Sequence, residues 1–191
     1  MAITPEKIDR WAKKGKIGNI VKAAASEDAA VREAADKALD EIVQSCSKNL
    51  STLADRKAKV KAARMLGQTK DKRAVRPLIS AWYSALGEAR VAIVEALGEL
   101  GDEGGIEKVR TSLYDSTWGH IPDGQLRRAS MQALKSIGTT EAHSILGAYE
   151  DRVQQERTDA RSGMAFRCPY CSRTVSRYTT SCPHCHGILK K

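Results

Sequence analysis

The sequence repeats itself at an offset of 31 residues, and this periodicity constrains the fold more than any other feature. Residues 58–67 (AKVKAARMLG) align with residues 89–98 (ARVAIVEALG), and the likeness continues to a pair of aspartates, Asp71 and Asp102. A period of this length with two helical segments per unit is typical of stacked helical repeats. One such unit cannot bury its apolar face alone, so several units must pack together.

Each unit is expected to contain a first helix, a short turn with Gly or Asp, and a second helix. In residues 89–100 the apolar side chains recur at helical spacing on one face. Gly98 and Gly101 are expected at the end of that first helix, where glycine tolerates a left-handed backbone. Shorter copies of the pattern surround Leu39 and Leu134.

The repeated string and the turn aspartates resemble HEAT repeats, in the short form known as phycobilisome-lyase-like repeats. The resemblance covers roughly residues 5–158 and implies an all-α fold, a right-handed α-solenoid of helical pairs. A repeat-level likeness does not transfer the bilin chemistry of those lyases. We expect a solenoid over residues 1–151 with these parts: a degenerate N-terminal cap (1–25) and units at about 28–55, 56–86, 88–115 and 124–151.

A basic residue stands seven positions before each anchoring leucine, as in Lys59 and Arg90, with Arg32 and Arg127 in the outer copies. In HEAT-like units such a base commonly ties its helix to the acid of an adjacent turn. The resemblance therefore implies ion pairs with Asp71 and Asp102.

Four cysteines in two matched C-P-x-C pairs follow the helical region: Cys168, Cys171, Cys182 and Cys185. Two thiolates two residues apart can bind one metal ion from one turn, and a second turn completes a four-sulfur shell that suits zinc. We expect one structural Zn²⁺, because four sulfurs leave no open position for water. Iron or a redox role is the alternative. Two disulfides would require an oxidising compartment, and no secretory signal is evident.

From Ala165 the chain resembles small zinc-ribbon domains, which implies a zinc ribbon over residues 165–191. We expect a helical extension and linker at 152–164 to join it to the solenoid. The ten residues between the pairs have room for a strand, a turn and a return strand. Ser172 follows the first pair where Gly is common, so it requires a left-handed backbone or a different turn. We expect Tyr170 to cover the small core of this module.

The net charge of +9 is concentrated in blocks. Residues 56–76 hold nine basic residues and one acid, and residues 160–191 hold six basic residues and no acid. Two interpretations explain such a run equally well: a face that contacts phosphates or an acidic protein, and a solvated helix with no ligand. The candidate binding residues are these: Lys57, Lys61, Arg64, Lys70, Lys72, Arg73, Arg76, Arg167, Arg173 and Arg177. A loop at 116–124 that interrupts the repeat adds Trp118, since insertions in solenoids often lie on the binding face.

We find no pattern of residues that indicates catalysis. The chain has four histidines and neither a Gly-rich phosphate loop nor a Ser-His-Asp candidate. We therefore expect a non-enzymatic, cytoplasmic adaptor that binds a partner protein, with no membrane segment and no small-molecule substrate. The alternative is a nucleic-acid-binding or ribosome-associated protein that uses the basic residues of 56–76 and the ribbon.

Overall fold

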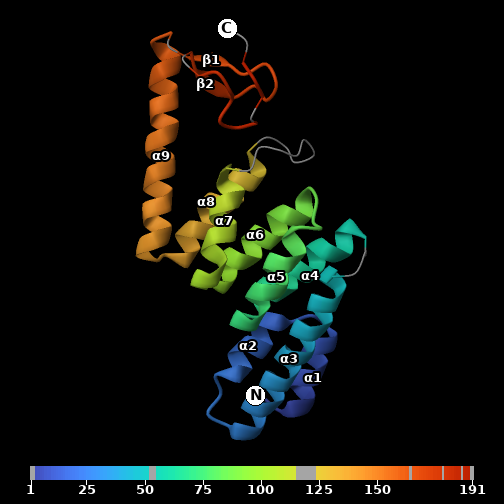
Figure 1. The fold of residues 1–191 in the computed structure, drawn as a ribbon. Coiled ribbons are helices and arrows are strands. Elements are labelled where there is room, and N and C mark those ends of the chain that lie inside the picture. The colour runs from blue at the N-terminus through green and yellow to red at the C-terminus, as the bar shows by residue number, and fades with distance from the viewer. Residues whose placement is uncertain are drawn as a thin grey trace.

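The computed structural model describes residues 3–51, 55–114, 124–163, 165–177, 179–185 and 187–189. Over these residues the chain is a stack of helices that ends in a small two-stranded module, with the two termini at opposite ends (Figure 1). The elements are α1 (Pro5–Lys13), α2 (Ile17–Ala24), α3 (Ala29–Ser51), α4 (Arg56–Gln68), η1 (Lys72–Ala74), α5 (Val75–Trp82), α6 (Glu88–Leu100), η2 (Glu103–Gly105), α7 (Ile106–Tyr114), α8 (Gln125–Ile137), α9 (Thr140–Arg161), β1 (Ala165–Arg167) and β2 (Thr174–Ser176).

Three helical pairs form the solenoid: α4 with α5, α6 with α7, and α8 with α9. The first helices of the pairs pack side by side, with α6 between α4 and α8. Apolar side chains from both helices of each pair, such as Leu66, Leu78, Leu97 and Leu113, form one continuous buried core. The described part of the chain is thus the predicted all-α solenoid.

The N-terminal region has a core of its own. Helices α1 and α2 both pack on α3, around buried Ile8, Ile17 and Ile20. Trp11 is half-buried at the edge of this cluster. Residues 28–51 of the first predicted unit contain one long helix, so α3 takes the place of a helical pair.

The first helices approach one another through glycine. A Cβ atom added to Gly67 would lie 2.8 Å from the Cα atom of Ala96, and one added to Gly98 would lie 2.5 Å from the Cα atom of Ala133. Both glycines are buried inside their helices. The expectation that Gly98 ends its helix is wrong: it permits close packing, and Gly101 is the left-handed residue at the helix end (φ 66°).

The turns inside the repeats are built alike. Asp71 precedes η1 and accepts a hydrogen bond from the backbone N–H of Arg73 at 2.9 Å, and Asp102 precedes η2 and does the same for Gly104. Each carboxylate satisfies an N–H group that the start of a helix leaves without an intrahelical partner.

Three of the four repeated bases contact groups other than these acids. Arg32 donates to the carbonyl of Ser26, Lys59 to the hydroxyl of Ser84, and Arg90 to the carbonyl of Ala85. The reason is geometric, because Lys59 lies near the start of α4 and Asp71 beyond its end, roughly 14 Å of helix away. The bases stabilise the loops that precede or follow the helical pairs, which lie at the opposite end from the acids.

Replacing Gly98 by alanine should lower the free energy of unfolding. Overpacking against the α8 backbone costs about 1–3 kcal/mol, which outweighs a helix-propensity gain of up to about 1 kcal/mol. Gly147→Ala in α9 is the matched control, because a Cβ there meets nothing within 4 Å. Urea denaturation should show the midpoint falling for Gly98→Ala and rising for Gly147→Ala. Equal shifts in one direction would contradict the close-packing role.

Candidate metal centre and charged surfaces

The C-terminal module is a short antiparallel sheet with two cysteine turns. Strand β1 pairs with β2 in the register Ala165 to Ser176, Phe166 to Val175 and Arg167 to Thr174. The ten residues between the cysteine pairs have room for two strands, but the structure places β2 there and its partner β1 before Cys168. A further bridge joins Ser181 to Ile188 beyond the second pair.

The four cysteine sulfurs converge on one point. All four Sγ atoms lie within 4.8 Å of one another. The Sγ atoms of Cys168 and Cys185 are 3.7 Å apart, and those of Cys171 and Cys182 are 3.6 Å apart. Zinc–sulfur bonds of about 2.3 Å give a tetrahedron with edges of about 3.8 Å. The spacing fits a tetrahedral metal ion and exceeds the length of a disulfide, about 2.05 Å.

Backbone N–H groups support the sulfurs in a repeated pattern. Each cysteine sulfur accepts a hydrogen bond from the N–H group two residues further on, as from His184 to Cys182 at 3.4 Å. Ser172 takes the left-handed conformation that its position requires (φ 55°), and the corresponding His186 lies outside the described residues. These donors favour the thiolate form that a metal ion needs.

The thiols differ in acidity because of their surroundings. Burial opposes ionisation of Cys168, but the N–H groups of Tyr170 and Cys171, with the Cys171 and Cys182 thiols, lower its pKa to about 7. Burial raises the pKa of Cys171 to about 12, and the thiols of Cys185 and Cys182 act in the same direction. Metal binding by this set therefore releases protons, so acid opposes it.

Tyr170 does not enter the core of the module. Its side chain is 67% exposed, and its ring packs on Gly187, where a Cβ would lie 2.6 Å from a ring carbon. The described core consists of Cys168, Val175, Cys182 and Leu189. Among the described residues of the module, the core is thus formed by cysteine and aliphatic side chains rather than by aromatic rings.

A groove of about 680 Å³ runs along the first helices of the solenoid. Its charged side chains form stripes: Arg64 comes from α4, Glu88, Glu95 and Glu99 from α6, and Arg128 from α8. The floor is small and apolar, including Gly98 and Ala133. We call this surface the first-helix groove.

The helical pairs and their turn aspartates have a counterpart among known protein families. Residues 43–121 match the family model of HEAT repeats. This part of the chain is a HEAT-repeat array. Comparison with curated proteins gave no match. The matched residues include α4 to α7, hence the α4 and α6 walls of the groove.

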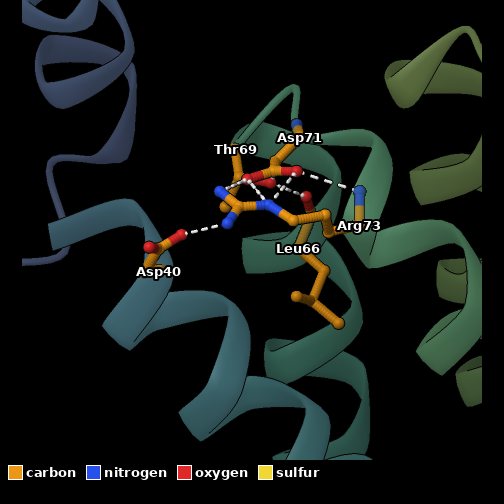
Figure 2. A network of polar contacts seen from close by, with 5 residues as sticks. All are labelled: Asp40, Leu66, Thr69, Asp71 and Arg73. Atoms are coloured by element: carbon orange, nitrogen blue, oxygen red, sulfur yellow. Dashed lines mark hydrogen bonds and ion pairs between the residues drawn. The ribbon is translucent and has the colours of Figure 1, made fainter. Parts of the chain in front are cut away.

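Three of the predicted binding residues of 56–76 form contacts with neighbouring helices and turns. Arg73 forms ion pairs with Asp71 in its own turn and with Asp40 on α3, as Figure 2 shows. Lys72 contacts Asp102 at 3.4 Å, and Lys70 donates to the main-chain carbonyl of Glu99. The α4–α5 pair and its turn therefore use these cations to contact α3 on one side and α6 and its turn on the other.

The other predicted basic residues divide between two surfaces. Lys57, Lys61 and Arg64 are exposed on one side of α4 and line a smaller hollow with Val60 and Met65. Arg76 is exposed on α5, on the other helix of the pair. The structure therefore does not gather the whole basic run of 56–76 on one face.

The ribbon arginines also separate. Arg167 and Arg173 line a cavity of about 230 Å³ between the ribbon and the last repeat, whereas Arg177 is exposed and lies outside it. The cavity also includes Arg127 of α8 and Arg152 of α9, neither of which was among the predicted binding residues. Trp118 lies outside the described residues.

The sequence-based site also missed the acidic stripe of α6. Glu88, Glu95 and Glu99 recur at i, i+7 and i+11, between apolar positions of the same helix. That spacing places the three glutamates on one exposed side of α6, and this pattern could have been recognised in the sequence. Among the described residues, no helix is long and apolar enough to cross a membrane.

The Asp71 carboxylate should stabilise the fold in a pH-dependent way. The Arg73 side chain, and also its backbone N–H group, lowers the pKa of Asp71. A lowered pKa means that this stabilisation is complete above the unfolded value of about 3.9 and is lost as the pH falls through the folded value. Asp71→Ala should cost about 1 kcal/mol at pH 7, and Asp71→Asn less, because asparagine still accepts the Arg73 N–H bond.

Denaturation of wild-type and Asp71→Asn proteins between pH 7 and pH 3 measures this contribution. The difference in stability should shrink toward pH 3. Asp9→Asn, at an exposed position of α1, is the control and should stay within about 0.5 kcal/mol of wild type. A difference that does not depend on pH would show that the charge of Asp71 contributes nothing.

Proposed function

We propose that this chain is a non-catalytic scaffold that binds a partner protein in the first-helix groove, with one structural Zn²⁺ in the ribbon. The observation that carries the proposal is the groove itself. HEAT repeats are generally protein-interaction scaffolds, and solenoids bind partners along extended concave surfaces. Stripes of opposite charge side by side select the register of a partner segment through electrostatic complementarity.

The groove favours a partner segment whose basic side chains reach α6. Glu88, Glu95 and Glu99 extend over nearly the full length of that helix, while Arg64 and Arg128 flank them. A phosphate backbone is less suited to this surface, because the central stripe would repel it. The proposed ligand of the groove is therefore a protein segment.

Crosslinking tests the groove directly. A photo-crosslinking residue at Val91, which lines the groove, should give discrete adducts in cells, and one at exposed Thr111 of α7 should not. Glu88→Lys with Glu95→Lys should lower the adduct yield at least about tenfold, since the charge of the central stripe reverses. Glu103→Lys, exposed in η2, is the control for reversing a glutamate charge outside the groove.

Two outcomes would contradict this function. Adducts that are identical at Val91 and Thr111 would show that the groove is not the site of contact. Adducts that ribonuclease removes would support the nucleic-acid alternative.

The nucleic-acid alternative now depends on a smaller set of cations. Lys57, Lys61 and Arg64 remain exposed together, whereas Lys70, Lys72 and Arg73 take part in contacts between repeats. Binding to generic RNA or duplex DNA that falls steeply with salt, and that falls less steeply after all three α4 cations become alanine, would support this alternative.

The ribbon is proposed to hold zinc through Cys168, Cys171, Cys182 and Cys185. The sulfur spacing matches a closed four-thiolate shell, which stabilises a fold and leaves no position for substrate. The described core of the module is too small to fold by apolar burial, so the metal supplies the folding energy, on the order of 10 kcal/mol.

Purified protein should contain one equivalent of zinc per chain, and Cys182→Ser should lose it. Cys46→Ala is the matched control, because Cys46 is buried in α3, far along the chain from the four-sulfur cluster. A chelator should unfold the ribbon and leave the far-ultraviolet helical signal nearly unchanged. Zinc retained by Cys182→Ser, or collapse of the helices on chelation, would be the opposite result.

A further inference from the structure

Helix α4 carries a hollow of about 330 Å³ beside the first-helix groove. The α4 residues that line it recur at i, i+3, i+4, i+7, i+8 and i+11, which places them on one face of the helix: Lys57, Val60, Lys61, Arg64, Met65 and Gln68. Glu88 of α6 also lines it. Because Arg64 and Glu88 line the first-helix groove as well, the two surfaces are continuous. We call this second surface the α4 hollow.

The floor of the α4 hollow is apolar. Val60 and Met65 are half-buried and pack against the core of the repeats. Met65 also packs against the core of the N-terminal region, so the hollow lies where the two cores meet. A methionine side chain adapts its shape to what covers it, and covering a partly exposed apolar side chain is favourable. This floor therefore suits an apolar side chain of a partner.

Exposed cations flank the apolar floor. Lys57, Lys61 and Arg64 are exposed and lie along the same face of α4. Within the described part of the chain no ion pair involves these three side chains, in contrast to the cations of the turn that follows α4. Of the described residues that line the hollow, Glu88 alone is acidic. The surface thus has an excess of positive charge, which carboxylates complement.

A phosphate backbone matches the α4 hollow less well than an acidic protein segment does. Val60 and Met65 lie between the cations and offer a phosphate group no hydrogen-bond donor. Among the described lining residues there is no aromatic ring on which a base could stack. A protein segment with carboxylates around an apolar side chain matches the cations and the floor together.

The dimensions of the α4 hollow limit the length of its ligand. From Lys57 to Gln68 the helix rises about 16 Å, which a partner helix of about eleven residues or an extended segment of about five residues would cover. The volume of about 330 Å³ is near the lower limit of the cavities of about 300–1,000 Å³ that enclose small molecules. The hollow therefore accommodates a few side chains of a short segment.

We infer that the α4 hollow binds an acidic segment of the partner protein that carries one large apolar side chain. The apolar side chain lies against Val60 and Met65, and the flanking carboxylates face Lys57, Lys61 and Arg64. The inference rests on the proposed function in one respect, since this segment continues the one that occupies the first-helix groove. The partner is thereby specified further: its basic side chains reach α6, and its acidic end with the apolar side chain lies on α4.

Fluorescence anisotropy with synthetic peptides and the full-length zinc-loaded protein tests this site. The probe is a labelled peptide with a central leucine flanked by glutamates on both sides. One control peptide has glutamine in place of glutamate, and another has serine in place of leucine. We expect saturable binding of the probe, and binding at least about tenfold weaker for each control peptide, because each lacks one of the two matching features.

Variants of α4 locate the binding. Lys61→Glu should weaken binding of the probe at least about tenfold, and Lys61→Arg should retain it, since the charge is kept. Arg56→Glu is the matched control, because it makes the same change of charge at an exposed residue of the same helix that does not line the hollow. Equal weakening by Lys61→Glu and Arg56→Glu would show only a general effect of charge and would overturn the inference.

Failure of this inference can be told apart from failure of the proposed function. Adducts at Val91 that persist in Lys61→Glu, together with no binding of the probe, overturn the inference and leave the function of the groove intact. Probe binding that Lys61→Glu weakens supports the α4 hollow even where Val91 gives no adducts, a result that contradicts the function of the groove alone. Equal binding of all three peptides overturns the inference, as does binding of single-stranded oligonucleotides without affinity for the probe.

Discussion

The architecture depends on how closely the first helices of successive repeats approach. At Gly67 and Gly98 the backbone of one helix meets an alanine of the next, at distances that no side chain allows. This contact brings α4, α6 and α8 edge to edge. Their exposed charges therefore form adjacent stripes over a shallow apolar floor. The groove proposed as the partner-binding surface is a direct product of the same close packing.

Ion pairs and hydrogen bonds of charged side chains link successive helical pairs along the solenoid. Arg73 reaches back to Asp40 of α3 (Figure 2), and Lys70 and Lys72 reach forward to the end of α6 and its turn. These contacts are largely exposed, so each contributes modestly. Together they orient the α4–α5 pair relative to α3 and α6. Much of the basic excess of residues 56–76 is thus used within the protein.

The helical pairs, the cysteine cluster and the left-handed Ser172 could be predicted because each follows from a local pattern. Apolar spacing specifies a helix face, and C-P-x-C specifies a turn. The partners of the repeated bases could not be predicted, because they depend on which end of the pair a side chain reaches. The cavity between the ribbon and the last repeat could not be predicted from the sequence either. Its arginines come together only because the ribbon packs on α9: Arg127, Arg152, Arg167 and Arg173. Gly98 was misplaced because a glycine near a helix end suggests a cap, whereas here it permits tertiary contact.

The two apolar cores of the solenoid have a consequence for how the molecule comes apart. Helices α1 and α2 and the first half of α3 enclose one core, whereas Val43, Cys46 and Leu50 in the second half of α3 belong to the core of the remaining repeats. Ile42 and Met65 pack against both cores. In a linear array the terminal segment with the fewest shared contacts opens first. Helices α1 and α2 are such a terminal segment, because they pack mainly on α3, and their opening leaves α4, α6 and α8 in register. Thermal fluctuation and proteolytic cleavage are thereby directed to the amino-terminal end of the solenoid.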